Sequence, residues 1–377
     1  MIKKQYFLVS LLMLVCNLEL HASRSMYVDN FEIIIGDNNA ENALLIYAQS
    51  NGIETLLLYG LHIVNNNHNL TNTSTNSILA DFIYKAKTNY DILYVGATAE
   101  NEDFFTNVID TYNNSRNDAL EKFDIYNLEF EYWSDSATGA GGYYCTSYLT
   151  PNGLPCTVDG AFQYYISILQ TMNTLASNNI HAIITEAYVG WTTEEQAHII
   201  GANVDRLRLH AYVSDPNNAF NYSDNRLIDF ANGTPGLDVS IIYSSETDFM
   251  QNWLENNSML LAENIFTNDW VTASSGWRNN INLEGFTYFA YTKMEGTTLS
   301  IANNSFKTLN IYPNPIENTL YVKNINNLKK IKIYNNLGQL IIKTKKKKID
   351  LSELKRGVYF LQIHTENFIK TEKIIKE

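Results

Sequence analysis

The sequence is poor in cysteine, proline and histidine. Its 377 residues include 3 Cys, 6 Pro and 7 His. The histidines are scattered without the short spacings that metal sites use, so we predict neither a metal nor an organic cofactor. Apolar runs are also short. None reaches the roughly 20 residues that a transmembrane helix needs, and we predict no integral membrane span in the mature chain.

Basic residues are scarce in the first 303 residues. Residues 1–303 hold 12 Lys or Arg against 34 Asp or Glu, whereas residues 304–377 hold 15 against 6. An acidic body argues against nucleic acid as a partner, because phosphate binding needs a basic face. A Gly-rich phosphate loop is also absent after the first β-rich run, which argues against a nucleotide-binding sheet.

The N-terminus has the pattern of a cleaved signal peptide. Lys3 and Lys4 precede an apolar run over residues 6–15, and small residues follow at Ala22 and Ser23. We therefore expect residues 1–22 to be removed and the mature protein to be secreted or held at the cell surface.

Two cysteines remain in the expected mature chain, Cys145 and Cys156. In an oxidising compartment we expect them to pair, and closing so short a loop stabilises a fold by roughly 3 kcal/mol. They lie in residues 134–160, a segment rich in Tyr and Gly that we expect to determine substrate specificity.

Eight β-rich runs alternate with amphipathic helical stretches such as residues 160–179. This alternation predicts a (β/α)8 barrel over residues 24–303. The eight runs cover residues 26–36, 53–64, 91–100, 125–133, 180–191, 205–216, 239–247 and 286–294.

The last residues change to short β runs and turns, which predict a small β-sandwich over residues 304–377. Three motifs resemble the C-terminal sorting domain of the type IX secretion system: YPNP at 312–315, IYNNLGQ at 333–339 and LKRGVYFLQI at 354–363. The resemblance implies recognition by the type IX secretion machinery and export across the outer membrane, followed by release or surface attachment.

The fourth β run, residues 123–133, carries the clearest candidates for chemistry. Strand alternation places Asn127, Glu129 and Glu131 on one face, directed into the barrel, and the aromatic and apolar residues between them on the other. Two ionised carboxylates on one face repel each other. The repulsion raises one pKa and keeps a protonated general acid available near neutral pH.

At these residues the chain resembles glycoside hydrolase family 18, the chitinases and endo-β-N-acetylglucosaminidases. The family motif Asp-x-x-Asp-x-Asp-x-Glu falls on Asp124, Asn127, Glu129 and Glu131. Asn127 and Glu129 depart from it, because the family has Asp at both positions. The longer Glu129 side chain puts substrate-assisted catalysis in question.

The resemblance implies a mechanism and two further positions. Glu131 would be the general acid and base, while Glu129 and Tyr212 would position the substrate's 2-acetamido group. On the eighth strand the family commonly has Trp at the floor of the sugar site, and here Tyr291 takes that place. The implied substrate is an oligosaccharide or polysaccharide that contains N-acetylglucosamine, such as a chitin-like polymer, an N-glycan or peptidoglycan.

Other strand ends supply candidate substrate-binding residues, because a barrel of this class builds its site at the carboxyl ends of its strands. With Asn127 and Tyr291, we expect the binding residues to be Trp133, Glu186, Trp191, His210, Tyr243 and Glu246.

Three alternatives remain open. In the first, Glu129 and Glu131 serve structure alone, paired with barrel groups such as Arg208 or His210. In the second, Glu131 and Glu246 act as the acid and nucleophile of a two-carboxylate retaining glycosidase. A barrel that binds carbohydrate without cleaving it is the third, and the departures at Asn127 and Glu129 favour it.

Overall fold

The computed structural model describes residues 23–294, 310–323, 328–335, 340–365 and 369–377. The predicted signal peptide and the predicted domain boundary at 303/304 lie outside these residues. The chain divides into two compact units, a barrel unit and a C-terminal β unit. Among the described residues, no helix combines the length and the apolar character needed to cross a membrane.

The barrel unit is a closed ring of eight parallel strands in sequence order, and it confirms the predicted (β/α)8 fold. One strand falls within or overlaps each predicted run. The strands are β1 Ser23–Val28, β2 Thr55–Leu58, β3 Tyr94–Ala99, β4 Ile125–Leu128, β5 Ile184–Val189, β6 Arg206–His210, β7 Leu237–Ser244 and β8 Ile281–Phe289.

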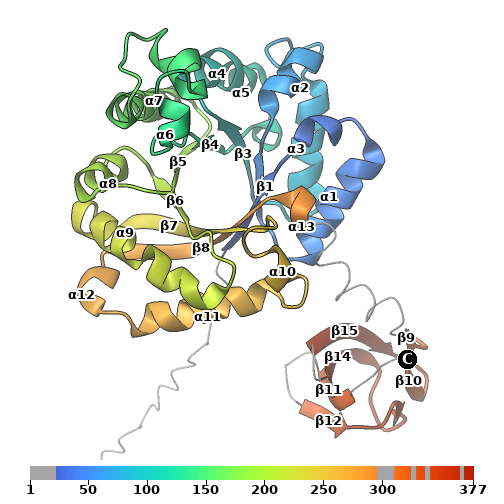
Figure 1. The fold of residues 1–377 in the computed structure, drawn as a ribbon. Coiled ribbons are helices and arrows are strands. Elements are labelled where there is room, and N and C mark those ends of the chain that lie inside the picture. The colour runs from blue at the N-terminus through green and yellow to red at the C-terminus, as the bar shows by residue number, and fades with distance from the viewer. Residues whose placement is uncertain (1–22, 295–309, 324–327, 336–339, 366–368) are drawn as a thin grey trace, which may run out of the picture. The chain divides into compact units, whose positions relative to one another are not determined.

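Helices surround this ring, as Figure 1 shows. The longer ones are α1 Asn38–Ser50, α2 Leu61–His68, α3 Ser77–Asn89, α7 Val158–Asn178, α8 Glu194–Gly201, α9 Ala219–Gly233 and α11 Met259–Thr272. The short ones are α4 Glu102–Phe104, α5 Thr111–Ser115, α6 Asp135–Thr138, α10 Gln251–Leu254, α12 Ser275–Arg278 and α13 Tyr291–Met294. Short turns of 3-10 or π geometry are η1 Phe31–Ile33, η2 Phe105–Asp110, η3 Ala119–Glu121, η4 Cys145–Leu149 and η5 Pro216–Asn218.

Two strands end earlier than the apolar runs that predicted them. Asn30 has a φ of 54° and Gly60 a φ of 76°, and both are N-caps of the turn or helix that follows. Left-handed backbone cannot continue a strand. Phe31 therefore lies in η1, and Leu61 and Val64 lie in α2, with their side chains buried.

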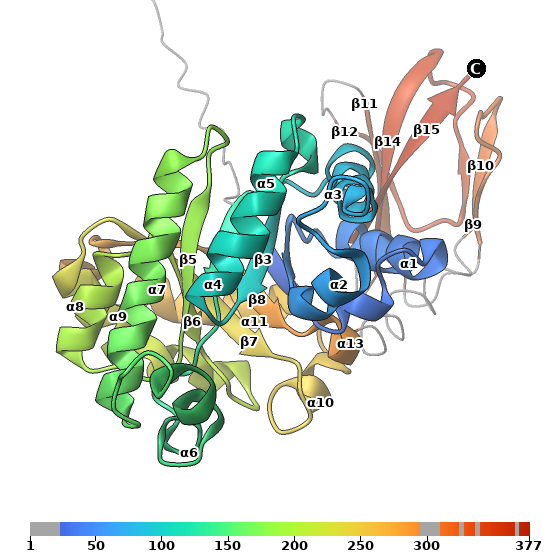
Figure 2. The same ribbon diagram turned by 90° about the horizontal axis from the view of Figure 1, so that it is seen from above.

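The disulfide and α7 together hold the segment that follows β4. Cys145 and Cys156 are bonded, with their Cα atoms 4.9 Å apart, which confirms the predicted pair. Immediately after it, the Thr157 side chain accepts from the Gly160 N–H and caps α7. Figure 2 shows α7 alongside β5, where the Tyr165 hydroxyl donates to the Tyr188 carbonyl at 3.0 Å.

A buried ion cluster fills part of the barrel interior. The fully buried Glu186 accepts from Arg208 Nε at 2.5 Å and Nη2 at 2.8 Å, and also pairs with Arg206. Burial alone would raise the pKa of Glu186, but the two guanidinium groups outweigh it and hold that pKa below its ordinary value. This cluster lies below the carboxyl ends of the strands.

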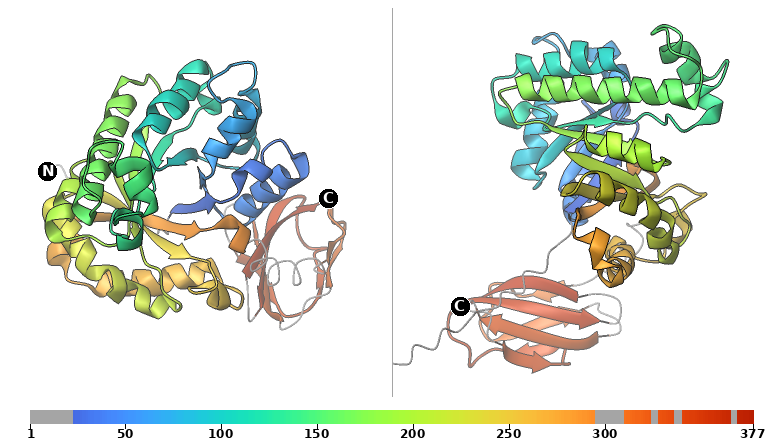
Figure 3. Two further views of the ribbon diagram at one scale, coloured as in Figure 1. Left: turned by 45° about the horizontal axis from the view of Figure 1, so that its top comes forward. Right: turned by 90° about the vertical axis from the view of Figure 1, so that its left-hand side faces the viewer.

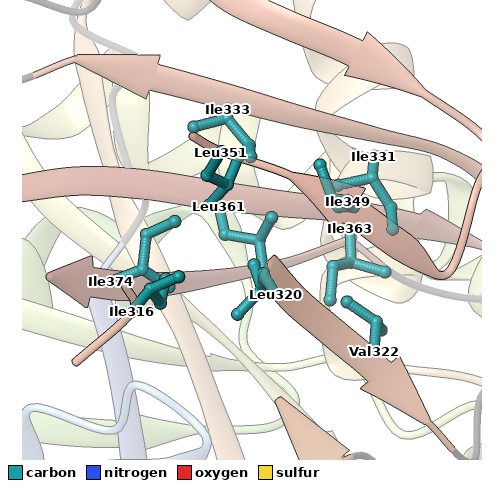
Figure 4. Close-up of a cluster of buried hydrophobic side chains, with 10 residues drawn as sticks. All are labelled: Ile316, Leu320, Val322, Ile331, Ile333, Ile349, Leu351, Leu361, Ile363 and Ile374. Carbon is teal, nitrogen blue, oxygen red and sulfur yellow. The ribbon is translucent and has the colours of Figure 1, made fainter. Parts of the chain in front are cut away.

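The C-terminal β unit has two antiparallel sheets, of strand orders β13-β10-β9 and β12-β11-β14-β15, seen in both views of Figure 3. Their strands are β9 Asn310–Tyr312, β10 Thr319–Lys323, β11 Leu328–Asn335, β12 Leu340–Thr344, β13 Lys348–Asp350, β14 Gly357–Thr365 and β15 Ile369–Lys376. Buried side chains from both sheets, such as Leu320 and Ile349 against Ile331 and Ile363, form one core (Figure 4).

We predict that Arg208→Met lowers the free energy of unfolding of the barrel by about 3 kcal/mol or more. Removing one member of a buried ion cluster leaves the remaining charge under-compensated, at a cost of about 3–5 kcal/mol. Glu195→Gln is the control, because Glu195 is exposed on α8 and surface substitutions usually change stability by about 0.5 kcal/mol or less. Chemical denaturation checks both, and equal losses would contradict the prediction.

Candidate active site

Glu129 and Glu131 follow directly after β4, at the carboxyl ends of the barrel strands. The Glu129 N–H still donates to the Ala99 carbonyl at 3.1 Å, so the backbone continues the strand ladder past Leu128. Between and beside the two glutamates, the buried Phe130 and Tyr132 pack away from the barrel axis, against Tyr144 and Tyr165 respectively. The predicted alternation therefore persists although β4 itself is short.

Glu129 is partly buried, and its partner is a phenol. The Tyr59 hydroxyl donates to Glu129 Oε2 at 3.1 Å. Burial, followed by the charges of Glu131 and Glu100, raises the pKa of Glu129 to about 8, although the Tyr59 hydrogen bond opposes the rise. Glu129 is consequently protonated at neutral pH.

The partners of Glu131 are also tyrosine hydroxyls. The Tyr188 hydroxyl donates to Glu131 Oε1 at 3.4 Å, and Tyr188 is in turn hydrogen-bonded to Tyr212. Burial and the charge of Glu246 raise the pKa of Glu131, against the effect of the Tyr188 hydrogen bond. The structure thus brings three predicted residues, Glu129, Glu131 and Tyr212, to one mouth of the barrel.

The cations proposed as structural partners of this pair are engaged elsewhere or uncharged. Arg208 binds Glu186 and Thr287. His210 is 8% exposed, and neither of its ring nitrogens has a hydrogen-bond partner among the described residues. Burial and the nearby Arg226 lower the pKa of His210 to about 3, so this imidazole is neutral at physiological pH. Its ring lies edge-on to Tyr212.

Asn127 and Glu186 do not reach the mouth. Both are fully buried, and Asn127 Nδ2 donates to Glu186 Oε2 at 3.1 Å while its Oδ1 accepts from Tyr27 at 3.1 Å. With these polar atoms hydrogen-bonded inside the barrel and both side chains fully buried, neither side chain is open to a ligand at the mouth. This corrects the prediction that they bind substrate: they support the strands from below.

The prediction that Tyr243 and Tyr291 bind substrate is also corrected, because both side chains face the helix layer. Tyr243 is fully buried, stacked on Phe286, and its hydroxyl donates to the Ala262 carbonyl. Tyr291 lies in α13, past the end of β8, and packs against Tyr47. Phe289 takes the interior position that the sequence analysis gave to Tyr291.

Phe289 is the last residue of β8. Its ring lies 5.5 Å from Tyr27 and 6.5 Å from Tyr212, measured between centroids. It belongs to the apolar cluster that fills the barrel interior beneath the glutamates.

The remaining predicted residues lie around the mouth. Trp133 is partly buried, with its ring 5.7 Å from Tyr188. Trp191 is 52% exposed, and the Arg226 guanidinium lies 5.1 Å above its ring. Glu246 follows β7 and accepts from Ser244 Oγ at 2.9 Å. An exposed indole face at this position can stack on a sugar ring.

Three residues of the site were missed by the sequence analysis: Tyr59, Glu100 and Tyr188. Tyr59 and Glu100 directly follow β2 and β3, and Tyr188 is near the end of β5. Searching the residue after every strand, instead of concentrating on the fourth, would have found the first two. The described residues contain no group of three or more His, Cys, Asp or Glu arranged to hold a metal ion.

Several solved structures resemble the chain at low identity. β-Glucuronidase 2 from Bacteroides uniformis, covalently bound to cyclophellitol-6-carboxylate aziridine, is 7% identical, with a TM-score of 0.44, over 95% of this chain and 46% of that one. A family 18 chitinase from Crocus vernus is 9% identical, with a TM-score of 0.43, over 74% of this chain and 97% of that one. The chain spans about half the length of the glucuronidase. A comparison with curated proteins finds no match.

The tail matches a family model. Residues 310–377 match the model described as secretion system C-terminal sorting domain. This match confirms the predicted sorting domain, and it supports secretion or export to the cell surface for the chain that carries it.

Proposed function

We propose that this protein is an exported glycosidase that cleaves glycans containing N-acetylglucosamine, with Glu131 as general acid and base. The observation that carries the proposal is the pair Glu129 and Glu131. Both are partly buried at the mouth of the barrel, both have raised pKa values, and the partners described for both are phenols instead of cations. Carboxylates held in this way are costly to folding unless they serve chemistry.

The proposed reaction follows the substrate-assisted route. The oxygen of the substrate's 2-acetamido group attacks the anomeric carbon while the bond to the leaving oxygen breaks, and Glu131 gives that oxygen its proton. Water then attacks the same carbon from the side of the departed group, the bond from that carbon to the acetamido oxygen breaks, and Glu131 takes a proton from the water. Repulsion between Glu129 and Glu131 retains one proton on the pair at neutral pH. In the free protein Glu129 holds this proton, and in the proposed reaction it passes to Glu131 when the glycan binds.

Glu129 and Tyr212 position the acetamido group in this proposal. Glu129 is longer than the Asp that family 18 has at this position, but the Tyr59 hydroxyl holds its carboxyl group. Tyr188 is hydrogen-bonded to both Tyr212 and Glu131. Trp133 and Trp191 supply aromatic faces beside the reacting sugar.

The two-carboxylate mechanism is the second candidate, and one observation favours it. The charge of Glu246 raises the pKa of Glu131, which indicates that the two carboxyl groups are near each other. A retaining glycosidase of that kind would use Glu246 as the nucleophile, with no need for an acetamido group.

Export is the other part of the proposal. We infer that the C-terminal β unit directs the chain through the type IX secretion machinery, and that the barrel acts on a glycan outside the cell. The sorting-domain match at residues 310–377 supports this inference.

We predict that Glu131→Gln lowers hydrolysis of N-acetylglucosamine oligomers at least 100-fold, because loss of a general acid typically costs a factor of about 10²–10⁴. Release of new reducing ends is the measurement. Glu195→Gln, an exposed change on α8, is the matched control and keeps the wild-type rate. Unchanged hydrolysis by Glu131→Gln would remove this mechanism, and binding without turnover by the wild type would favour a carbohydrate-binding barrel.

The same assay separates the two mechanisms. Substrate-assisted catalysis predicts that Glu246→Gln retains most of the activity and that glucosides lacking the acetamido group are not cleaved. A loss of 100-fold or more in Glu246→Gln, together with cleavage of such glucosides, would establish the two-carboxylate mechanism instead.

The raised pKa of Glu129 also predicts a pH-dependent stability. Because this pKa is about 8 in the folded chain and about 4.3 in an unfolded one, the stabilising effect of the bound proton is complete below pH 4 and is lost as the pH rises towards 8. Glu129→Gln lacks this dependence. We expect the variant to be more stable than the wild type at pH 8 by about 1 kcal/mol or more, since a change of one in pKa corresponds to about 1.4 kcal/mol.

Denaturant unfolding at pH 5 and pH 8 measures the free energy of unfolding of both proteins. We expect the advantage of Glu129→Gln over the wild type to be larger at pH 8 than at pH 5. Glu195→Gln serves again as the control and should follow the wild type at both values. Parallel behaviour of Glu129→Gln and wild type would show that Glu129 titrates normally.

A further inference from the structure

A pocket of about 230 Å³ lies next to the candidate catalytic pair, at the ends of β2 and β3. Its wall includes Tyr59, whose hydroxyl binds Glu129, so the pocket adjoins the proposed cleavage site. Glu100, Tyr143 and Tyr148 also line it. The proposed mechanism assigns no function to these last three residues.

The only formal charge among the described lining residues is the carboxylate of Glu100, with His62 as the one other titratable group besides the tyrosines. No Lys or Arg lines the pocket. Burial raises the pKa of Glu100, although the hydrogen bond from Tyr148, the charge of His62 and the hydrogen bond from Tyr143 oppose the rise. Glu100 also contributes to the raised pKa of Glu129. Among the described lining residues, only His62 opposes the charge of Glu100.

Tyrosine rings form the outer wall. The Tyr148 hydroxyl donates to Glu100 Oε2 at 3.2 Å, and the hydroxyls of Tyr143 and Tyr148 lie 3.0 Å apart. Tyr148 also stacks on Tyr164 of α7, with ring centroids 5.7 Å apart. These contacts hold Tyr148 against the pocket, and aromatic faces beside a carboxylate attract a cation.

The disulfide links this wall to the start of α7. Cys145 lies between Tyr143 and Tyr148 and is bonded to Cys156, just before α7. The rings are consequently tied to a long helix of the barrel, and the pocket is built on a rigid support as binding sites require.

We propose that this pocket binds a protonated amine, and that the preferred glycan carries a free-amino glucosamine unit next to the N-acetylglucosamine unit that is cleaved. The inference rests on the proposed glycosidase function and names the substrate more closely. The ammonium group would pair with Glu100 and lie against the rings of Tyr143 and Tyr148. A neutral acetamido group offers no charge to offset that of Glu100, and an acidic sugar would be repelled by it.

The experiment measures binding in the full chain with Glu131→Gln, which prevents turnover. Two probes are titrated by calorimetry: a fully acetylated N-acetylglucosamine tetramer and a partially deacetylated tetramer with one free amine. We expect the deacetylated tetramer to bind about tenfold more tightly, and Glu100→Gln in the same background to abolish this difference. Higher salt should reduce the preference, because the contact is between charges.

Controls separate this proposal from loss of fold and from the proposed function. Glu195→Gln removes a carboxylate from the outside of the barrel and should keep the tenfold preference, while thermal unfolding establishes that each variant is folded. Tyr148→Phe keeps the ring and removes the hydroxyl that binds Glu100, and should retain part of the preference.

The possible outcomes are distinguishable. Equal binding of the two tetramers, unaltered by Glu100→Gln, would overturn the amine pocket and leave the glycosidase proposal standing. If neither tetramer binds, the glycosidase proposal itself fails and the amine pocket falls with it.

Discussion

The contact on which the mouth of the barrel depends is the buried cluster of Glu186 with Arg206 and Arg208. Arg208 is the arginine that the sequence suggested as a partner for Glu129 and Glu131. Its guanidinium group instead donates to Glu186 and Thr287, inside the barrel. The glutamates at the mouth therefore keep phenols as partners. A phenol stabilises a carboxylate less than a guanidinium does, and the pKa values of both glutamates remain raised.

Aromatic residues complete this arrangement. Tyr59 directly follows β2, Tyr188 lies in β5 and Tyr212 follows β6. Their side chains enclose the carboxyl groups without adding charge. The enclosure lowers access to water, which strengthens the repulsion between the glutamates. The same residues supply hydrogen-bond donors, so the acids are held in place although they are not neutralised.

Much of the fold followed from the sequence because each barrel strand falls within or overlaps an apolar run that alternates with a helical one. Strand ends were harder to predict. Apolar residues on both sides of Asn30 and Gly60 look alike in the sequence, and only the left-handed backbone at those two positions separates strand from helix.

For the site, the alternation of the fourth run placed Glu129 and Glu131 correctly on one face. The same rule, applied to the seventh run, would have turned Tyr243 outward, because Ile242 belongs to the interior cluster. Tyr291 was placed by resemblance and lies beyond the strand end, in α13. Asn127 and Glu186 form hydrogen bonds with residues of other barrel strands, which are distant in the sequence. No local sequence pattern shows which strands lie next to each other.

The disulfide in the Tyr-rich segment, residues 134–160, determines when that segment reaches its final structure. Before export, a reducing cytoplasm keeps Cys145 and Cys156 as thiols, and the segment carrying Tyr143 and Tyr148 lacks its covalent tie to the start of α7. Oxidation outside the cytoplasm supplies that tie. A chain exported by its sorting domain would thus complete the wall that carries Tyr143 and Tyr148 only after leaving the compartment in which it was made.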